Sequence, residues 1–198
     1  MRKTLTALTA VIACALPSGA QAATAGHHDN VATAINQTDA TQVSDFAWGI
    51  SRQRGGDIVD QLNSAHAEAT CTDCGATAIA FQIVLVSGSP SKVIPVNEAV
   101  AINDRCTRCK TAAEARQFVR VVDQRVKITG QGRRELADVR NRLRSLTNQD
   151  LPLDQLHQAV ETQEARVREV LNSDLVTAAD PHEDADVLDA KLLQDTAG

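Results

Sequence analysis

Four cysteines are the side chains of this sequence that are best suited to chemistry. They form two Cys-x-x-Cys motifs, Cys71–Cys74 and Cys106–Cys109. Thiolates in two such pairs can hold a zinc ion as a four-sulfur site, exchange electrons as a dithiol and a disulfide, or close structural disulfide bridges. Which chemistry applies depends on the redox compartment in which the chain folds.

The N-terminal segment indicates export. Residues 1–22 contain Arg2 and Lys3, a short apolar stretch over residues 4–16 and the small-residue cleavage site Ala20-Gln21-Ala22. This arrangement is typical of a secretory signal peptide, and the apolar stretch is too short to span a membrane. We therefore expect a protein of the extracellular space or the cell envelope, without a transmembrane segment in its mature chain. In the alternative, Val11-Ile12-Ala13-Cys14 is a lipoprotein box and Cys14 anchors the chain through a lipid.

Export favours oxidised cysteines. Removal of residues 1–22 changes the formal net charge from −5 to −7 and leaves four cysteines, an even number. Thiols of exported proteins usually pair, so we predict two structural disulfides and no metal at Cys71, Cys74, Cys106 and Cys109. A zinc site at the same four residues and a redox-active pair are the alternatives. Four cysteines allow three pairings, and the sequence leaves local and crossed bridges equally open.

The cysteine motifs belong to a unit that recurs at a regular spacing. Each copy has the order Asn-x-Ala-x-Ala, Cys-x-x-Cys, seven residues, and then Gln followed by apolar residues. One copy begins at Asn63 and the next at Asn97, and a fainter copy without cysteines begins at Asn30. This regularity predicts a repeated supersecondary unit in which each copy covers the apolar face of the next.

Polar and apolar residues alternate in several segments, which predicts strands. These segments are residues 30–36, 43–51, 57–69 and 93–102. The first two are close enough in sequence to form a β-hairpin.

The segments that follow the cysteine pairs are predicted to be helical. Residues 111–122 are rich in Ala, Glu, Arg and Gln, which favour a helix. Residues 75–86 resemble a buried strand by composition, but equivalent repeats should share one structure, so we expect a helix there too. Each cysteine pair would then lie where a strand meets the N-terminus of a helix, and such a position lowers a thiol pKa.

Past residue 128 the pattern changes to helical periodicity. Apolar residues follow helical spacing from Leu136 to Leu146 and again from Leu153 to Val170, with Pro152 near the break.

The predicted fold class is α+β, with an N-terminal β-hairpin, repeated strand–CxxC–helix units and a C-terminal antiparallel helical hairpin. The predicted divisions are a signal peptide (1–22), a disulfide-bonded repeat domain (23–128), the helical hairpin (129–173) and an acidic, disordered tail (174–198).

The sequence lacks the usual catalytic motifs. None of the five histidines forms a zinc-protease motif, and there is no nucleophile elbow, phosphate-binding loop or dinucleotide fingerprint. We therefore expect no catalytic residues and no cofactor.

Aromatic residues are 2% of the chain, so we expect no nucleic-acid binding, which relies on aromatic stacking. Residues 105–144 carry twelve Lys or Arg and four Asp or Glu, a basic excess that suits either a solvated surface or an envelope polyanion or protein partner.

These motifs resemble those of an uncharacterised family of secreted actinobacterial proteins. The resemblance covers residues 30–172 and rests on Asn63, Asn97, the two cysteine motifs and the segments 56–60, 78–86 and 117–118. Some relatives are labelled peptide zinc metalloprotease, but this sequence contains no protease motif, and the resemblance implies no catalytic residue.

The sequence as a whole predicts an exported, non-catalytic structural or binding domain with two structural disulfides. The alternative is a thiol–disulfide oxidoreductase or a four-cysteine zinc-binding protein.

Overall fold

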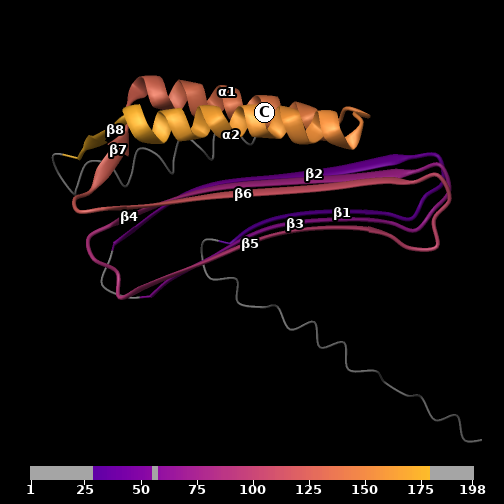
Figure 1. The fold of residues 1–198 in the computed structure, drawn as a ribbon, viewed down its shortest axis with the longest axis horizontal. Coiled ribbons are helices and arrows are strands. Elements are labelled where there is room, and N and C mark those ends of the chain that lie inside the picture. The colour runs from indigo at the N-terminus through magenta and orange to yellow at the C-terminus, as the bar shows by residue number, and fades with distance from the viewer. Residues whose placement is uncertain (1–28, 55–57, 179–198) are drawn as a thin grey trace, which may run out of the picture.

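Two parallel three-stranded sheets form most of the molecule. The computed structural model describes residues 29–54 and 58–178. The strands are β1 (Asn30–Asn36), β2 (Gln42–Arg54), β3 (Ile58–Ala69), β4 (Gly75–Ser87), β5 (Lys92–Asn103) and β6 (Lys110–Val122). One sheet has the order β1-β3-β5 and the other the order β2-β4-β6, so successive strands alternate between sheets (Figure 1). The chain therefore winds as a β-solenoid of three coils, each made of one strand from either sheet.

The strand register sets each coil one sequence repeat from the next. Asn30 pairs with Asn63, and Asn63 pairs with Asn97. In the other sheet, Gln42 pairs with Gly75 and Gly75 with Lys110. Residues at equivalent positions of the sequence repeat are thus neighbours across the coils.

The predicted α+β fold class is wrong, because the fold is mostly β. Residues 75–86 and 111–122 belong to strands β4 and β6 rather than helices. Strand β4 is buried along almost its whole length, since the other sheet covers one face and the helices cover the other. A strand buried on both faces has no polar–apolar alternation, and neighbouring strands override the weak helical preference of Ala, Glu and Arg.

The predicted N-terminal hairpin is also wrong. Strands β1 and β2 follow each other closely but lie in different sheets. Each pairs in parallel with the strand one coil later, β1 with β3 and β2 with β4. The turn at residues 37–41 therefore carries the chain from one sheet to the other.

Small side chains fill the space between the two sheets. A buried cluster of alanines from both sheets occupies one half of this interior, and its members are Ala32, Ala34, Ala65, Ala67, Ala76, Ala78, Ala80 and Ala115. Val59, Val84 and Val86 fill the other half. Because alanine projects only a methyl group, the sheets can approach closely over the first region.

Two helices cover the outer face of the β2-β4-β6 sheet. Helix α1 (Gly130–Thr147) and helix α2 (Leu153–Ser173) lie side by side over it (Figure 1). The larger core lies between these layers and combines Ile79, Phe81, Ile83 and Leu85 of β4 with buried aliphatic residues of both helices. Phe81 also stacks on Trp48 of the preceding coil, with ring centroids 6.0 Å apart. The two helices occupy the predicted range, and they share their core with the solenoid.

A short antiparallel pair joins the ends of the helical layer. Strand β7 (Val126–Ile128) precedes α1, and strand β8 (Leu175–Thr177) follows α2 and pairs with β7. The first residues of the predicted acidic tail therefore form a strand. The rest of that tail and the predicted signal, including Cys14, lie outside the described residues. Within the described part of the chain, no helix is both long and apolar enough to cross a membrane.

Candidate functional site

Three equivalent turns are stacked at one end of the solenoid. They join β1 to β2, β3 to β4 and β5 to β6. Ala40, Asp73 and Arg108 occupy the same place in the three turns, and their φ angles of 55°, 54° and 56° are all in the left-handed region. Backbone hydrogen bonds link successive turns, from Ala40 N to the Thr72 carbonyl (3.0 Å) and from Asp73 N to the Thr107 carbonyl (2.9 Å). The turns are therefore aligned at this position, and the third turn is one residue longer and has an additional left-handed residue, Arg105, at φ 46°.

The cysteine pairs close the second and third turns. The sulfurs of Cys71 and Cys74 lie at disulfide distance, as do those of Cys106 and Cys109, and both pairs have a Cα–Cα distance of 6.0 Å. Of the three pairings that the sequence allows, the structure shows the local one.

The first turn has threonines where the other two have cysteines. Strand register places Thr38 opposite Cys71 and Thr41 opposite Cys74. The Thr41 hydroxyl donates to the Thr38 carbonyl at 2.7 Å, and Thr38 N donates to Asn36 Oδ1 at 3.0 Å. A hydrogen bond thus closes the first turn at the place where a sulfur pair closes the others. The Thr-x-x-Thr spacing, one repeat before the first Cys-x-x-Cys, was a signal that sequence analysis missed.

The four sulfurs form one cluster, because the turns are stacked. Cys74 Sγ lies 3.5 Å from Cys109 Sγ, and the sulfurs of Cys74, Cys106 and Cys109 all lie within 4.8 Å of one another. Cys71 and Cys74 are 5% and 4% exposed, whereas Cys106 and Cys109 are half-buried. We call Cys71, Cys74, Cys106 and Cys109 the cysteine ladder.

The cysteine ladder precedes strands and not helices. Cys74 is followed directly by β4 and Cys109 by β6. The predicted helix N-termini, whose dipoles would lower the thiol pKa values, are therefore not there.

An ion pair joins the two cysteine turns. The Arg108 guanidinium donates through Nε and Nη2 to the two carboxylate oxygens of Asp73, one coil earlier. The hydrogen bond from Arg108 lowers the pKa of Asp73, and Asp73 in turn raises the pKa of Arg108. Both side chains are exposed, so this pair aligns the turns while remaining in contact with solvent.

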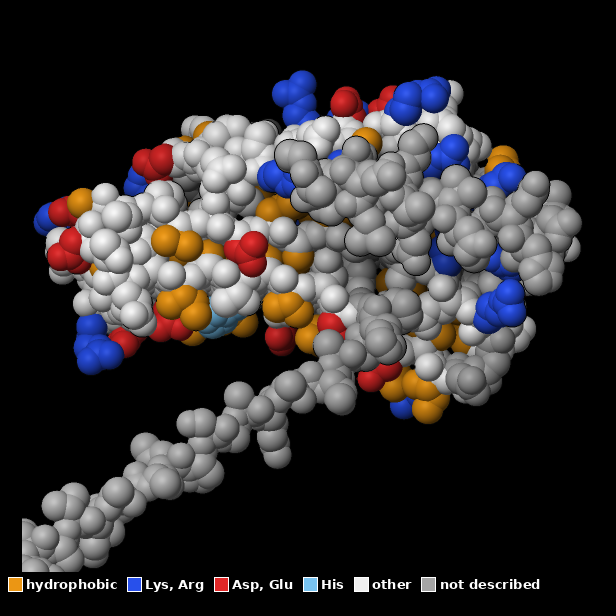
Figure 2. All heavy atoms as spheres, turned by 180° about the vertical axis from the view of Figure 1, so that it is seen from behind, with side chains coloured by type: hydrophobic (Ala, Val, Ile, Leu, Met, Phe, Trp, Pro, Cys, Tyr) orange, Lys and Arg blue, Asp and Glu red, His pale blue; other side chains and the backbone are white. Residues whose placement is uncertain are grey.

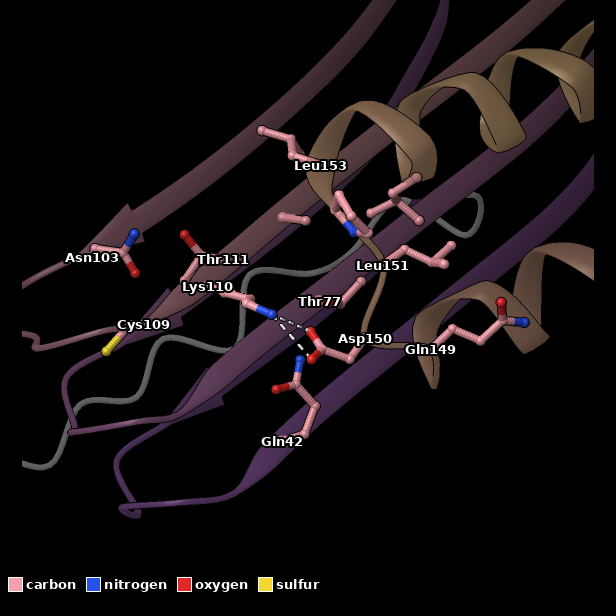
Figure 3. Close-up of a pocket in the computed structure, with 13 residues that line it drawn as sticks. Gln42, Thr77, Asn103, Cys109, Lys110, Thr111, Gln149, Asp150, Leu151 and Leu153 are labelled. Carbon is pink, nitrogen blue, oxygen red and sulfur yellow. Dashed lines mark hydrogen bonds and ion pairs between the residues drawn. The ribbon is translucent and has the colours of Figure 1, made fainter.

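A hollow of about 340 Å³ lies beside the cysteine ladder (Figure 3). It separates the start of β6 from the connection between α1 and α2, and Cys109 is among its lining residues. Lys110 Nζ binds the two carboxylate oxygens of Asp150 at 2.9 and 3.0 Å in this region. Gln42 lies below this ion pair in the figure, and Leu151 and Leu153 lie above it.

A second polar cluster fastens α2 to β6. The Glu114 carboxylate, whose side chain is 8% exposed, binds Arg116 Nη2 at 2.9 Å and His157 Nδ1 at 3.0 Å. Arg116 also binds Glu164 of α2 at 2.8 Å. The hydrogen bond from Glu114 raises the pKa of His157, and the attraction of the Glu114 charge acts in the same direction. Burial raises the pKa of Glu164, but hydrogen bonds from Arg168 and Arg116 outweigh this effect and lower it overall.

The outer face of the β1-β3-β5 sheet carries exposed aliphatic side chains. Val31, Ile35, Val96, Val100 and Ile102 are between 38% and 50% exposed. His66 also lies on this face, with Nε2 3.5 Å from a Glu68 carboxylate oxygen. In Figure 2, several Lys and Arg side chains lie over the helical layer and hydrophobic side chains are scattered over the sheets below it.

Comparison with protein-family models, with curated proteins and with solved structures finds no match to this chain.

Proposed function

We propose that the chain is an exported, non-catalytic structural or binding domain whose cysteine pairs are structural bridges. The observation that supports this most directly is the equivalence of Thr38 and Thr41 with the two cysteine pairs. A threonine hydrogen bond closes the same turn in the first coil, so turn closure alone accounts for the position of the cysteines.

The composition of the interior explains why such bridges would be useful. One half of the space between the sheets contains mainly alanine. Alanine buries less apolar area than the larger aliphatic residues, and hydrophobic stabilisation scales with that area. A bridge across a turn of this length lowers the entropy of the unfolded chain and contributes about 2 kcal/mol.

The surroundings of the cysteines support the structural role over a redox role. A reactive thiol needs access to its substrate and a lowered pKa. Cys71 and Cys74 are buried, and the nearby charge of Arg108 is paired with Asp73. The oxidoreductase alternative is favoured by one observation, which is that the half-buried Cys109 borders a hollow.

Intact-mass measurement of protein recovered from culture medium tests the proposal. We expect a mature chain that begins near Ala23, has a mass four hydrogen atoms below the reduced value, and takes up alkylating agent only after reduction. Four free thiols, or a lipid on Cys14 with the protein in the detergent phase, would contradict the proposal.

Threonine variants separate the structural role from the redox role. In the double variant Cys71→Thr, Cys74→Thr, the second turn has the threonines of the first. We expect it to fold with a free energy of unfolding lower by about 2 kcal/mol, without free thiols at Cys106 and Cys109. The matched control is Cys106→Thr with Cys109→Thr in the more exposed turn. We expect the wild type to show no turnover in an insulin-reduction assay, so turnover that either double variant abolishes would refute the structural role.

A further inference from the structure

We propose that the cysteine ladder, once both of its bridges are reduced, binds one Zn²⁺ ion through four thiolates. This inference goes beyond the proposed function, which concerns the oxidised chain. It depends on the convergence of two Cys-x-x-Cys turns from neighbouring coils.

The distances between sulfurs on different coils suit a zinc site. Tetrahedral coordination with Zn–S bonds of about 2.3 Å places the sulfurs about 3.8 Å apart. Cys74 Sγ and Cys109 Sγ are already 3.5 Å apart, and Cys106 Sγ lies within 4.8 Å of both. Three ligands from two turns therefore meet with only small side-chain movements required.

Cys71 supplies the fourth ligand. Its sulfur lies at disulfide distance from Cys74 and 3.2 Å from the Asn36 carbonyl oxygen, so it has to turn from that carbonyl towards the other three sulfurs when the bond opens. Each turn then contributes two thiolates at Cys-x-x-Cys spacing, the arrangement of structural zinc sites. The left-handed residues Asp73 and Arg108 lie directly before the second cysteine of each pair, so the backbone bends alike at this position of the two motifs.

The chemical balance requires an external reductant. Each bridge takes up two electrons and two protons, and a dithiol supplies both as it closes to its own disulfide. Four thiols result, and Zn²⁺ displaces their four protons as it binds, so the apparent affinity rises with pH. Disulfide bonding and zinc binding use the same sulfur atoms, so each state excludes the other.

The donor set and its burial favour zinc in a structural role. Thiolates are soft ligands that suit Zn²⁺ better than Mg²⁺ or Ca²⁺. Four protein ligands complete the tetrahedron and leave no position for water or substrate. Cys71 and Cys74, in the second turn, are buried, so their side of the site is shielded from solvent.

Metal titration of the reduced chain tests the proposal. The full chain carrying Cys14→Ser is reduced with a phosphine under anaerobic conditions, freed of reductant and titrated with Co²⁺ as a spectroscopic probe. We expect one Co²⁺ per chain with the absorption bands of tetrahedral four-thiolate coordination, and its displacement by one equivalent of Zn²⁺. The same chain with its bridges intact should bind neither ion.

A matched variant shows whether both turns are needed. Cys106→Thr with Cys109→Thr has the threonine turn of the first coil and keeps only one cysteine pair. We expect this variant to lose the four-thiolate spectrum, and we expect Zn²⁺ to raise the melting temperature of the reduced wild type but not that of the variant. Circular dichroism monitors the β-sheet of both proteins throughout.

Several results would overturn the proposal. The reduced wild type could bind no metal, could show the spectrum of only two thiolate ligands, or could bind one metal ion per two chains. The reduced chain could also unfold and fail to regain its β-sheet when Zn²⁺ is added. None of them affects the structural bridges, which the mass of the exported protein tests separately.

Discussion

The side-chain amide of Asn63 donates a hydrogen bond of 2.7 Å to Oδ1 of Asn97, one coil further along the solenoid. Asn30 makes the same bond to Asn63, also at 2.7 Å. Asn63 additionally donates to the carbonyls of Ala80 and Arg116 in the opposite sheet, at 3.2 and 3.1 Å. The three asparagines thus form a ladder that connects the three coils and also links the two sheets.

Replacement of Asn63 should be costly, because this residue is completely buried. Asn63→Ala removes the donor for one buried carbonyl and one partly buried carbonyl, and both of its bonds to the neighbouring asparagines. Each buried polar group left without a partner costs about 1–3 kcal/mol, so we expect the free energy of unfolding to fall by roughly 3 kcal/mol. Urea unfolding followed by circular dichroism measures this change.

Asn97→Ala is the control for that prediction. Asn97 lies on the exposed strand β5, where water can replace a lost partner. We expect a loss of about 1 kcal/mol for this variant. Equal losses for the two variants would show that the burial of Asn63 does not raise the cost of its replacement.

Sequence pattern predicts half-exposed strands much better than doubly covered ones. Strand β1 alternates strictly between buried and exposed residues, and its predicted range of 30–36 is correct. Strand β4 shows no such alternation because both of its faces are buried. Strand β6 carries Glu114 and Arg116, whose partners are on α2, and these contacts, which its sequence does not reveal, explain its helix-like composition.

The candidate site was only half predictable. Spacing in the sequence identified the four cysteines, and the structure places their sulfurs in two local pairs. Their convergence follows from the stacking of the turns, which depends on strand register. In this register, each strand pairs with the strand one whole repeat later. It can be deduced only once successive strands are known to alternate between two sheets.

A chain that ends at Ile128 should not form a stable monomer. The predicted boundary between repeat domain and helices lies there, and truncation would expose Ile79, Phe81, Ile83 and Leu85, which are at most 3% exposed in the whole chain. An exposed apolar face of this kind favours aggregation. Size-exclusion chromatography and circular dichroism of this chain and of a control ending at Ala178 test the prediction. A truncated chain that is monomeric and rich in β-sheet would show that the helices are dispensable.

Stability should depend on pH through His157. Glu114 raises the His157 pKa above its usual value of about 6.5, so the folded state binds this proton more tightly than the unfolded state. The stabilisation is fully present below about pH 6.5 and is lost as the pH rises through the raised pKa. Melting temperatures measured from about pH 5 to pH 9 should fall more steeply for the wild type than for His157→Gln.

Glu161→Gln is the matched control for the pH prediction. The Glu161 carboxylate lies 3.1 Å from His157 Nε2 but is exposed, and its effect on the His157 pKa is smaller than that of Glu114. This variant should keep most of the pH dependence of the wild type. A His157→Gln variant with the wild-type slope would show that the contact with Glu114 does not control it.

Two glycines of α1 should respond in opposite directions to replacement by alanine. A Cβ on Gly132 would lie 2.7 Å from Asp174 Cβ and 2.8 Å from Ile128 Cγ2, closer than carbon atoms can approach. Asp174 also accepts a hydrogen bond from Thr129, the residue that caps α1, so its displacement would disturb the start of the helix. We expect Gly132→Ala to lower the free energy of unfolding by about 1–3 kcal/mol.

Gly130 is the matched position at the start of the same helix. A Cβ there would meet only flexible guanidinium groups, the nearest 3.7 Å away on Arg134. Alanine has the higher helix propensity and restricts the unfolded chain, so Gly130→Ala should raise the free energy of unfolding by a few tenths to about 1 kcal/mol. Urea unfolding of both variants measures the two changes. A neutral Gly132→Ala would mean that α1 can move away from β7 and from the end of α2 without loss, and hence that this junction is not tightly packed.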